Sequence, residues 1–149
     1  MGADLFITPL YQRQPQQWQP QFEAAVKRRD SLKAGSKAHR QAQAKVSECY
    51  EKLNEQGYFR DPYNDWDLLW KFGLSWWGDV IPMLDDKDCL TIEQIRNLLA
   101  MLKERENVFE LKVAQLPPDD QRFFRRQYAS LQSFLNQAID LNTPVETWL

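Results

Sequence analysis

Few side chains in this 149-residue chain could perform covalent or metal chemistry. The single histidine is His39, and the two cysteines are Cys49 and Cys89. His39 and Cys49 fall on one expected helix, roughly 15 Å apart along its axis, so they cannot form a nucleophile pair. A pair between His39 and Cys89 stays open. One histidine and no CxxC motif exclude histidine-rich zinc sites and carboxylate-bridged di-iron sites.

Carboxylates near the tryptophans suggest a second kind of chemistry. Paired acids beside aromatic rings are typical of sugar-cleaving enzymes. Helix capping explains Asp65 and Asp67 equally well, because acids favour the first turn of a helix. We therefore keep a small-molecule or carbohydrate-binding pocket as the second alternative. The acids concerned are Asp61, Asp65, Asp67 and Asp79.

The acidic run at residues 85–88 resembles the end of a calcium loop, but the match fails. Counted from Asp86, the sixth position is Thr91, where an EF-hand needs glycine. The twelfth is Asn97, where it needs glutamate. No nucleotide-binding glycine loop or nucleophile-elbow motif occurs either. We expect no metal, no cofactor and no catalysis.

Positive charge is concentrated in one stretch. Residues 27–45 contain seven lysines or arginines and only one acid, Asp30, although the whole chain has a net charge of −2. Such a cluster at the end of a helical hairpin could bind phosphates, so nucleic-acid binding is our first alternative function. A smaller cluster at Arg122, Arg125 and Arg126 could extend it. The residues assigned to this alternative are Lys27, Arg28, Arg29, Lys33, Lys37 and Arg40.

Aromatic residues are the densest feature of the chain. Eight of them fall between residues 58 and 77: Tyr58, Phe59, Tyr63, Trp66, Trp70, Phe72, Trp76 and Trp77. With Leu69, Trp66 and Trp70 fall on one face of a short expected helix, which assigns them to the core. Adjacent residues on a helix point about 100° apart, so either Trp76 or Trp77 should be partly exposed. We select Tyr63, Phe72, Trp76 and Trp77 as the partner-binding residues.

The elements that would position these groups are mostly helical. Apolar spacing predicts helices over residues 20–33, 37–56, 92–114 and from 118 onward, with one or two short aromatic-rich helices between the second and third. Ser36 should cap the second helix, and Thr91 with Gln94 forms a capping box. Residues 1–19 are expected to be an irregular arm rich in proline and glutamine, and residues 142–149 a non-helical tail. The final Thr147-Trp148-Leu149 fits a PDZ-ligand pattern or a tail folded on the core.

Composition completes the prediction. Apolar residues make up 43% and charged residues 27%, as in globular domains, and helix-favouring residues dominate. The chain has no apolar run long enough to cross a membrane, and its first residues do not resemble a secretory signal, so we expect a cytoplasmic protein. We predict one all-α domain over residues 1–149, an irregular or orthogonal bundle of four to six helices. We expect a non-catalytic interaction module that binds a protein partner, or itself as a homo-oligomer, through aromatic residues in 58–82.

Overall fold

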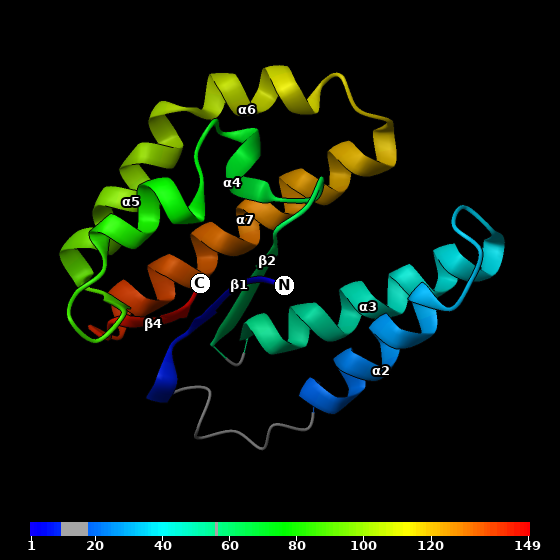
Figure 1. The fold of residues 1–149 in the computed structure, drawn as a ribbon, viewed down its shortest axis with the longest axis horizontal. Helices are drawn as coiled ribbons and strands as arrows, with labels where there is room; N and C mark the ends of the chain where they lie inside the picture. Colours follow the sequence, from blue (N-terminus) through cyan, green and yellow to red (C-terminus); the bar gives the residue numbers. More distant parts are fainter. Residues whose placement is uncertain (10–17, 56) are drawn as a thin grey trace.

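The computed structural model describes residues 1–9, 18–55 and 57–149, which form a four-stranded sheet with helices packed against it (Figure 1). The strands are β1 (Gly2–Phe6), β2 (Tyr58–Pro62), β3 (Cys89–Leu90) and β4 (Val145–Trp148). The longer helices are α2 (Trp18–Asp30), α3 (Lys37–Glu55), α5 (Ile92–Glu104), α6 (Glu106–Val113) and α7 (Pro118–Asp140). Three short turns, α4 (Leu68–Lys71), the π-helical η1 (Trp76–Val80) and the 3-10 helical η2 (Ile81–Met83), lie between β2 and β3.

The sheet makes this a mixed α/β protein, so the all-α prediction is wrong. Its order is β2-β1-β4-β3, and every neighbouring pair is antiparallel. β1 lies inside the N-terminal segment, residues 1–19, that was expected to be irregular. Residues 10–17 of that segment are outside the described residues. β4 lies within the 142–149 tail. The strands have at most five residues and pair across long sequence separations, so local alternation could not reveal them.

The long helices agree better with the expected pattern. α2 and α3 form the predicted antiparallel hairpin, and the Ser36 hydroxyl accepts a hydrogen bond from the His39 N–H near the start of α3. The Thr91 side chain accepts one from the Gln94 N–H at the start of α5, which confirms that cap. The single helix predicted over 92–114 is divided at Arg105 into α5 and α6.

The main core lies between the sheet and α7, with α5 and the short turns closing it. Ala3 and Leu5 of β1 point into this core, where Phe59 of β2 lies 6.1 Å from Phe134 of α7 between ring centroids. A second small cluster joins α2 to α3 through Ala25, Val46 and Cys49. None of the described helices is both long enough and apolar enough to span a bilayer.

Candidate interaction surface

Three tryptophans of the aromatic segment lie on the surface. Trp66, Trp70 and Trp77 are 41%, 63% and 61% exposed, whereas Trp76 is 1% exposed. We call Trp66, Trp70 and Trp77 the tryptophan surface. An aromatic ring of this size can bury roughly 150–250 Å², so a tryptophan on the surface leaves a large apolar area in contact with water.

The assignment of Trp66 and Trp70 to the core was therefore wrong. That prediction placed Trp66 inside the short helix, but α4 begins only at Leu68, after the Asp67 cap. The Asp67 carboxylate accepts a hydrogen bond from the Trp70 N–H, which fixes the helix start. With this start, Leu68, Leu69 and Phe72 face the core and Trp70 faces solvent.

Trp76 and Trp77 are adjacent in η1 and point in different directions, Trp76 into the core and Trp77 toward solvent. This confirms the prediction that one ring of the pair would be exposed. Trp77 lies beside Tyr63, at 6.2 Å between ring centroids. Of the four selected partner-binding residues, the structure thus brings Tyr63 and Trp77 together near the surface, whereas Phe72 and Trp76 are buried in the core.

Asp61 connects the inner side of this region. Its carboxylate is fully buried and accepts hydrogen bonds from the Trp76 Nε1–H at 2.7 Å and the Leu68 N–H at 2.8 Å. The Leu69 N–H donates to it at 3.3 Å. Burial raises the pKa of Asp61 well above its usual value; the nearby Asp67 carboxylate adds to the rise, and the three donors oppose it. Asp61 therefore ties the end of β2 to α4 and η1.

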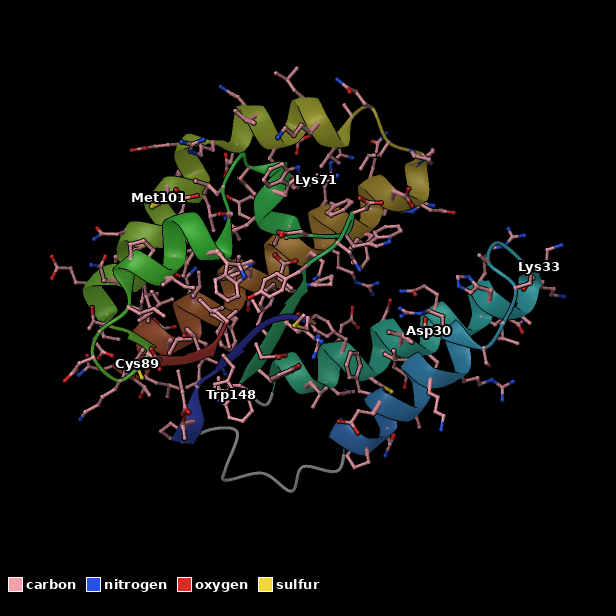
Figure 2. All side chains as sticks on the ribbon, in the orientation of Figure 1. Asp30, Lys33, Lys71, Cys89, Met101 and Trp148 are labelled. Atoms are coloured by element: carbon pink, nitrogen blue, oxygen red, sulfur yellow. The ribbon has the colours of Figure 1, made fainter. Side chains whose placement is uncertain are left out.

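Neighbouring helices hold the exposed rings in place. The Trp66 ring stacks near Phe124 of α7, at 5.8 Å, and meets Phe123 edge-on at 5.1 Å. Lys71 lies over the Phe124 ring at 4.9 Å, and Figure 2 shows it on α4 beside α7. The Trp66 ring therefore packs against the N-terminal part of α7.

On the other side of α4, Trp70 faces α6. The Lys112 ammonium donates a hydrogen bond to the Trp70 carbonyl at 3.1 Å and lies 6.0 Å from the Trp70 ring centroid. The Arg105 guanidinium donates to the Phe72 carbonyl at 3.5 Å. These two cations satisfy carbonyls at the end of α4, where the negative end of a helix favours positive charge. Leu111 of α6 is also exposed, so α6 adds an apolar side chain to the surface.

The proposed sugar pocket finds little support in this geometry. The expected lining was Tyr63, Trp66, Trp76 and nearby acids, but Trp76 and Asp61 are buried and hydrogen-bonded to each other. Asp67 is the N-cap of α4, Asp65 precedes it by two residues, and the Asp79 carboxylate accepts a hydrogen bond from the Ser75 N–H at 2.8 Å. An open hollow on α6 is lined by other residues: Asn107, Glu110, Leu111 and Ala114.

The chain end is built into the sheet. Thr147 is buried, and its hydroxyl donates to the Asp88 carbonyl at 2.8 Å. The Trp148 ring packs 5.4 Å from Phe6 on the sheet, away from Lys71 in Figure 2. β4 pairs with both β1 and β3, so a PDZ domain could take it only after it left the sheet.

The basic residues of 27–45 lie on the α2–α3 hairpin, away from the tryptophan surface. Figure 2 labels Lys33 at its far end and Lys71 on the body. Lys27, Arg28, Lys33, Lys37 and Arg40 are exposed, whereas Arg29 is half-buried against Gln43 and Asp30. His39 is half-buried on α3.

Sequence reasoning missed Trp66 and Trp70 as surface residues, and Phe123 as a contact of the Trp66 ring. The signal was present, since Asp67 is a good N-cap residue, and placing the cap there turns Trp70 outward. The contact between Trp66 and Phe123 joins residues far apart in the chain and had no local signal.

Comparisons with known proteins give no further guide. No family model, no curated protein and no solved structure matches this chain.

Proposed function

We propose that this protein is a non-catalytic interaction module that binds a protein partner, or a second copy of itself, through the tryptophan surface. The observation that carries the proposal is the exposure of Trp66, Trp70 and Trp77 within twelve residues of sequence. The two cysteines are free thiols, which fits the reducing cytoplasm as its location.

The exposed area is large enough to matter. Taking about 250 Å² for a whole tryptophan side chain, the exposed shares of the three rings amount to roughly 400 Å². A standard interface buries about 800 Å² on each partner, so the summed exposed area of the three rings equals about half of that area. At about 25 cal/mol per Å², their burial contributes roughly 10 kcal/mol before the costs of association.

The rings are also held before any partner arrives. Trp66 packs against Phe123 and Phe124, Trp77 packs against Tyr63, and the Lys112 ammonium lies 6.0 Å from the centroid of the Trp70 ring. A side chain already held in its binding conformation loses less entropy on association. This favours the tryptophan surface over isolated exposed apolar residues, which are common on proteins.

The test compares two variants that lose exposed tryptophan. Trp70→Ala with Trp77→Ala removes two rings of the tryptophan surface, and Trp148→Ala removes a ring of similar exposure on the sheet. We expect the wild type to show a mass that rises with concentration in analytical ultracentrifugation, or to retain a defined protein in pull-down. Only the double variant should lose this binding.

The proposal is refuted if the wild type neither self-associates nor retains a protein. Equal loss of binding in Trp148→Ala and the double variant would also refute it, because non-specific association of exposed apolar side chains would then explain the binding. Thermal melting should show that each variant remains folded.

A further inference from the structure

The α2–α3 hairpin projects from the body of the protein (Figure 1), and from here on "the arm" means this hairpin. α2 packs on α3 through Ala25, Val46 and Cys49, and α3 in turn contacts β2 and α7. At the base of the arm, the Tyr50 hydroxyl donates to the Arg60 carbonyl and accepts from the Arg60 N–H, both at 2.8 Å. The opposite end, around Lys33, is the part farthest from the body in Figure 2.

Charge is strongly separated between the end of this arm, residues 27–45, and the rest of the chain. Residues 27–45 carry seven positive and one negative side chain, a net +6. The whole chain has a net charge of −2, so the remaining residues carry −8. The end of the arm is thus a local positive region on an acidic protein, and the net charge of the whole chain underestimates the positive potential there.

Most of the positive side chains at the end of the arm lack an acidic partner. Among the described residues, no ion pair involves any of the five exposed ones, Lys27, Arg28, Lys33, Lys37 and Arg40. The second basic cluster differs, because each of its arginines is paired. Arg122 pairs with Asp119, Arg125 with Glu110 and Arg126 with Glu51. The two basic clusters therefore differ in charge pairing, although both are simply groups of lysines and arginines in the sequence.

The start of α3 adds a local conflict. Lys37 and Arg40 occupy its first residues, and the first turn contains no acid. Positive side chains there oppose the helix dipole, because the amino end of a helix carries partial positive charge. Lys27, Arg28 and Arg29 in the last turn of α2 suit the dipole and need no other explanation. Residues placed against local preference are expected at functional sites, and here an external anion would resolve the conflict.

The remaining surface of the arm indicates which anion fits. No large hydrophobic residue is exposed among its described side chains, whereas the body exposes several tryptophans. Protein interfaces need apolar anchors, and membrane-surface helices need an apolar face. Single-stranded nucleic acid is bound through exposed aromatic rings, and none is exposed here among those side chains. A duplex backbone requires only positive charge and small polar groups.

We propose that the end of the α2–α3 hairpin binds the phosphate backbone of double-stranded nucleic acid without reading its bases. Lys27, Arg28, Lys33, Lys37 and Arg40 make the phosphate contacts. This site is separate from the tryptophan surface and does not depend on it.

The experiment measures binding of the full chain to a labelled 20-base-pair DNA duplex by fluorescence anisotropy at several salt concentrations. Each phosphate contact contributes about −0.9 to the slope of log affinity against log salt. With three to five contacts, affinity should fall about 40-fold to 500-fold between 50 and 200 mM salt. An unrelated duplex sequence should bind equally well.

Two triple variants provide the matched comparison. Arg28→Gln, Lys33→Gln and Arg40→Gln removes three unpaired charges of the arm. Arg122→Gln, Arg125→Gln and Arg126→Gln removes three paired charges of α7, so both variants have net charge −2 − 3 = −5. We expect the arm variant to lower affinity at least tenfold at 50 mM salt and to reduce the slope by about 2.7. The α7 variant should bind like the wild type.

Three outcomes would overturn the proposal. The first is no saturable binding of the wild type at 50 mM salt, up to about 100 μM protein, within the usual non-specific range. The second is an equal loss of affinity in both variants, which would show that only net charge matters. The third is arm-dependent binding to phosphatidylserine vesicles or to a second copy of the chain, without duplex binding. Melting temperatures of both variants verify that they are folded.

Discussion

Replacing Asp61 with alanine should destabilise the protein more than any other single carboxylate substitution near the aromatic segment. The carboxylate is fully buried and accepts from the N–H groups of Leu68, Leu69 and Trp76. Alanine would leave all three donors without an acceptor, in a region where Leu68 and Leu69 are themselves fully buried. Water could not easily replace the lost oxygen atoms.

The expected magnitude follows from the number of donors. An unsatisfied buried donor costs about 1–3 kcal/mol, so with three donors we expect Asp61→Ala to lose roughly 3–9 kcal/mol of unfolding free energy. Asp61→Asn keeps one oxygen acceptor and nearly the same volume, and should lose only about 1–3 kcal/mol. Asp67→Ala is the control, because Asp67 caps the same helix from a half-exposed position. Loss of that cap should cost about 0.5–2 kcal/mol.

Urea unfolding, followed by tryptophan fluorescence and by far-ultraviolet circular dichroism, measures these differences. If Asp61→Ala does not fold, Asp61→Asn still tests the reasoning against Asp67→Ala. The role given to Asp61 is wrong if Asp61→Ala loses less than about 1 kcal/mol, below the cost of a single orphaned donor.

The pH dependence gives Asp61 a second test with a definite sign. Burial raises the pKa of Asp61 in the folded state, so the folded protein binds a proton at higher pH than the unfolded chain. The unfolding free energy of the wild type should therefore rise, relative to Asp61→Asn, as the pH falls from the folded pKa toward about 3.9. A relative decrease over this window would show that the three donors outweigh burial.

Two further predictions use the same urea assay, and a third uses thermal melting. Trp76→Ala should lose about 3–5 kcal/mol as a buried ring, whereas Trp77→Ala should change stability by less than about 1 kcal/mol; equal losses would contradict the inward and outward assignment. Tyr50→Phe should lose about 1–3 kcal/mol, because its hydroxyl serves both the N–H and the carbonyl of Arg60, and an unchanged midpoint would dismiss that role. Deleting residues 146–149 should lower the melting temperature strongly, since β4 joins β1 to β3; an unchanged temperature would mean that the tail is not part of the core.

Local signals predicted much of the helical structure. The hairpin of α2 and α3 follows from apolar spacing and Ser36, and the start of α5 follows from Thr91 and Gln94. The opposite directions of Trp76 and Trp77 follow from helix geometry alone. These features depend on residues within a few positions of one another, so the sequence contains their causes.

The sheet could not be predicted in this way. Phe6 is apolar but lies on the sheet face opposite Ala3 and Leu5, and β2 contains the buried Asp61, so neither strand shows clean alternation. Each strand forms because partners from distant parts of the chain satisfy its backbone groups. The contact of Trp66 with Phe123 and the ion pair of Arg126 with Glu51 could not be predicted either, because each joins residues far apart in the sequence.

The sequence by itself determined where the aromatic and basic residues are concentrated and which long segments are helical, because composition and helical spacing are local properties. Only the tertiary structure decided which rings are exposed and which positive charges are unpaired. It turned Trp70 outward and buried Trp76 on Asp61. Among the described residues, it left the five exposed positive side chains at the end of the arm without an ion pair, whereas the three arginines of α7 pair with acids. Exposure and charge pairing depend on which distant segments meet, and that is fixed only when the whole chain packs.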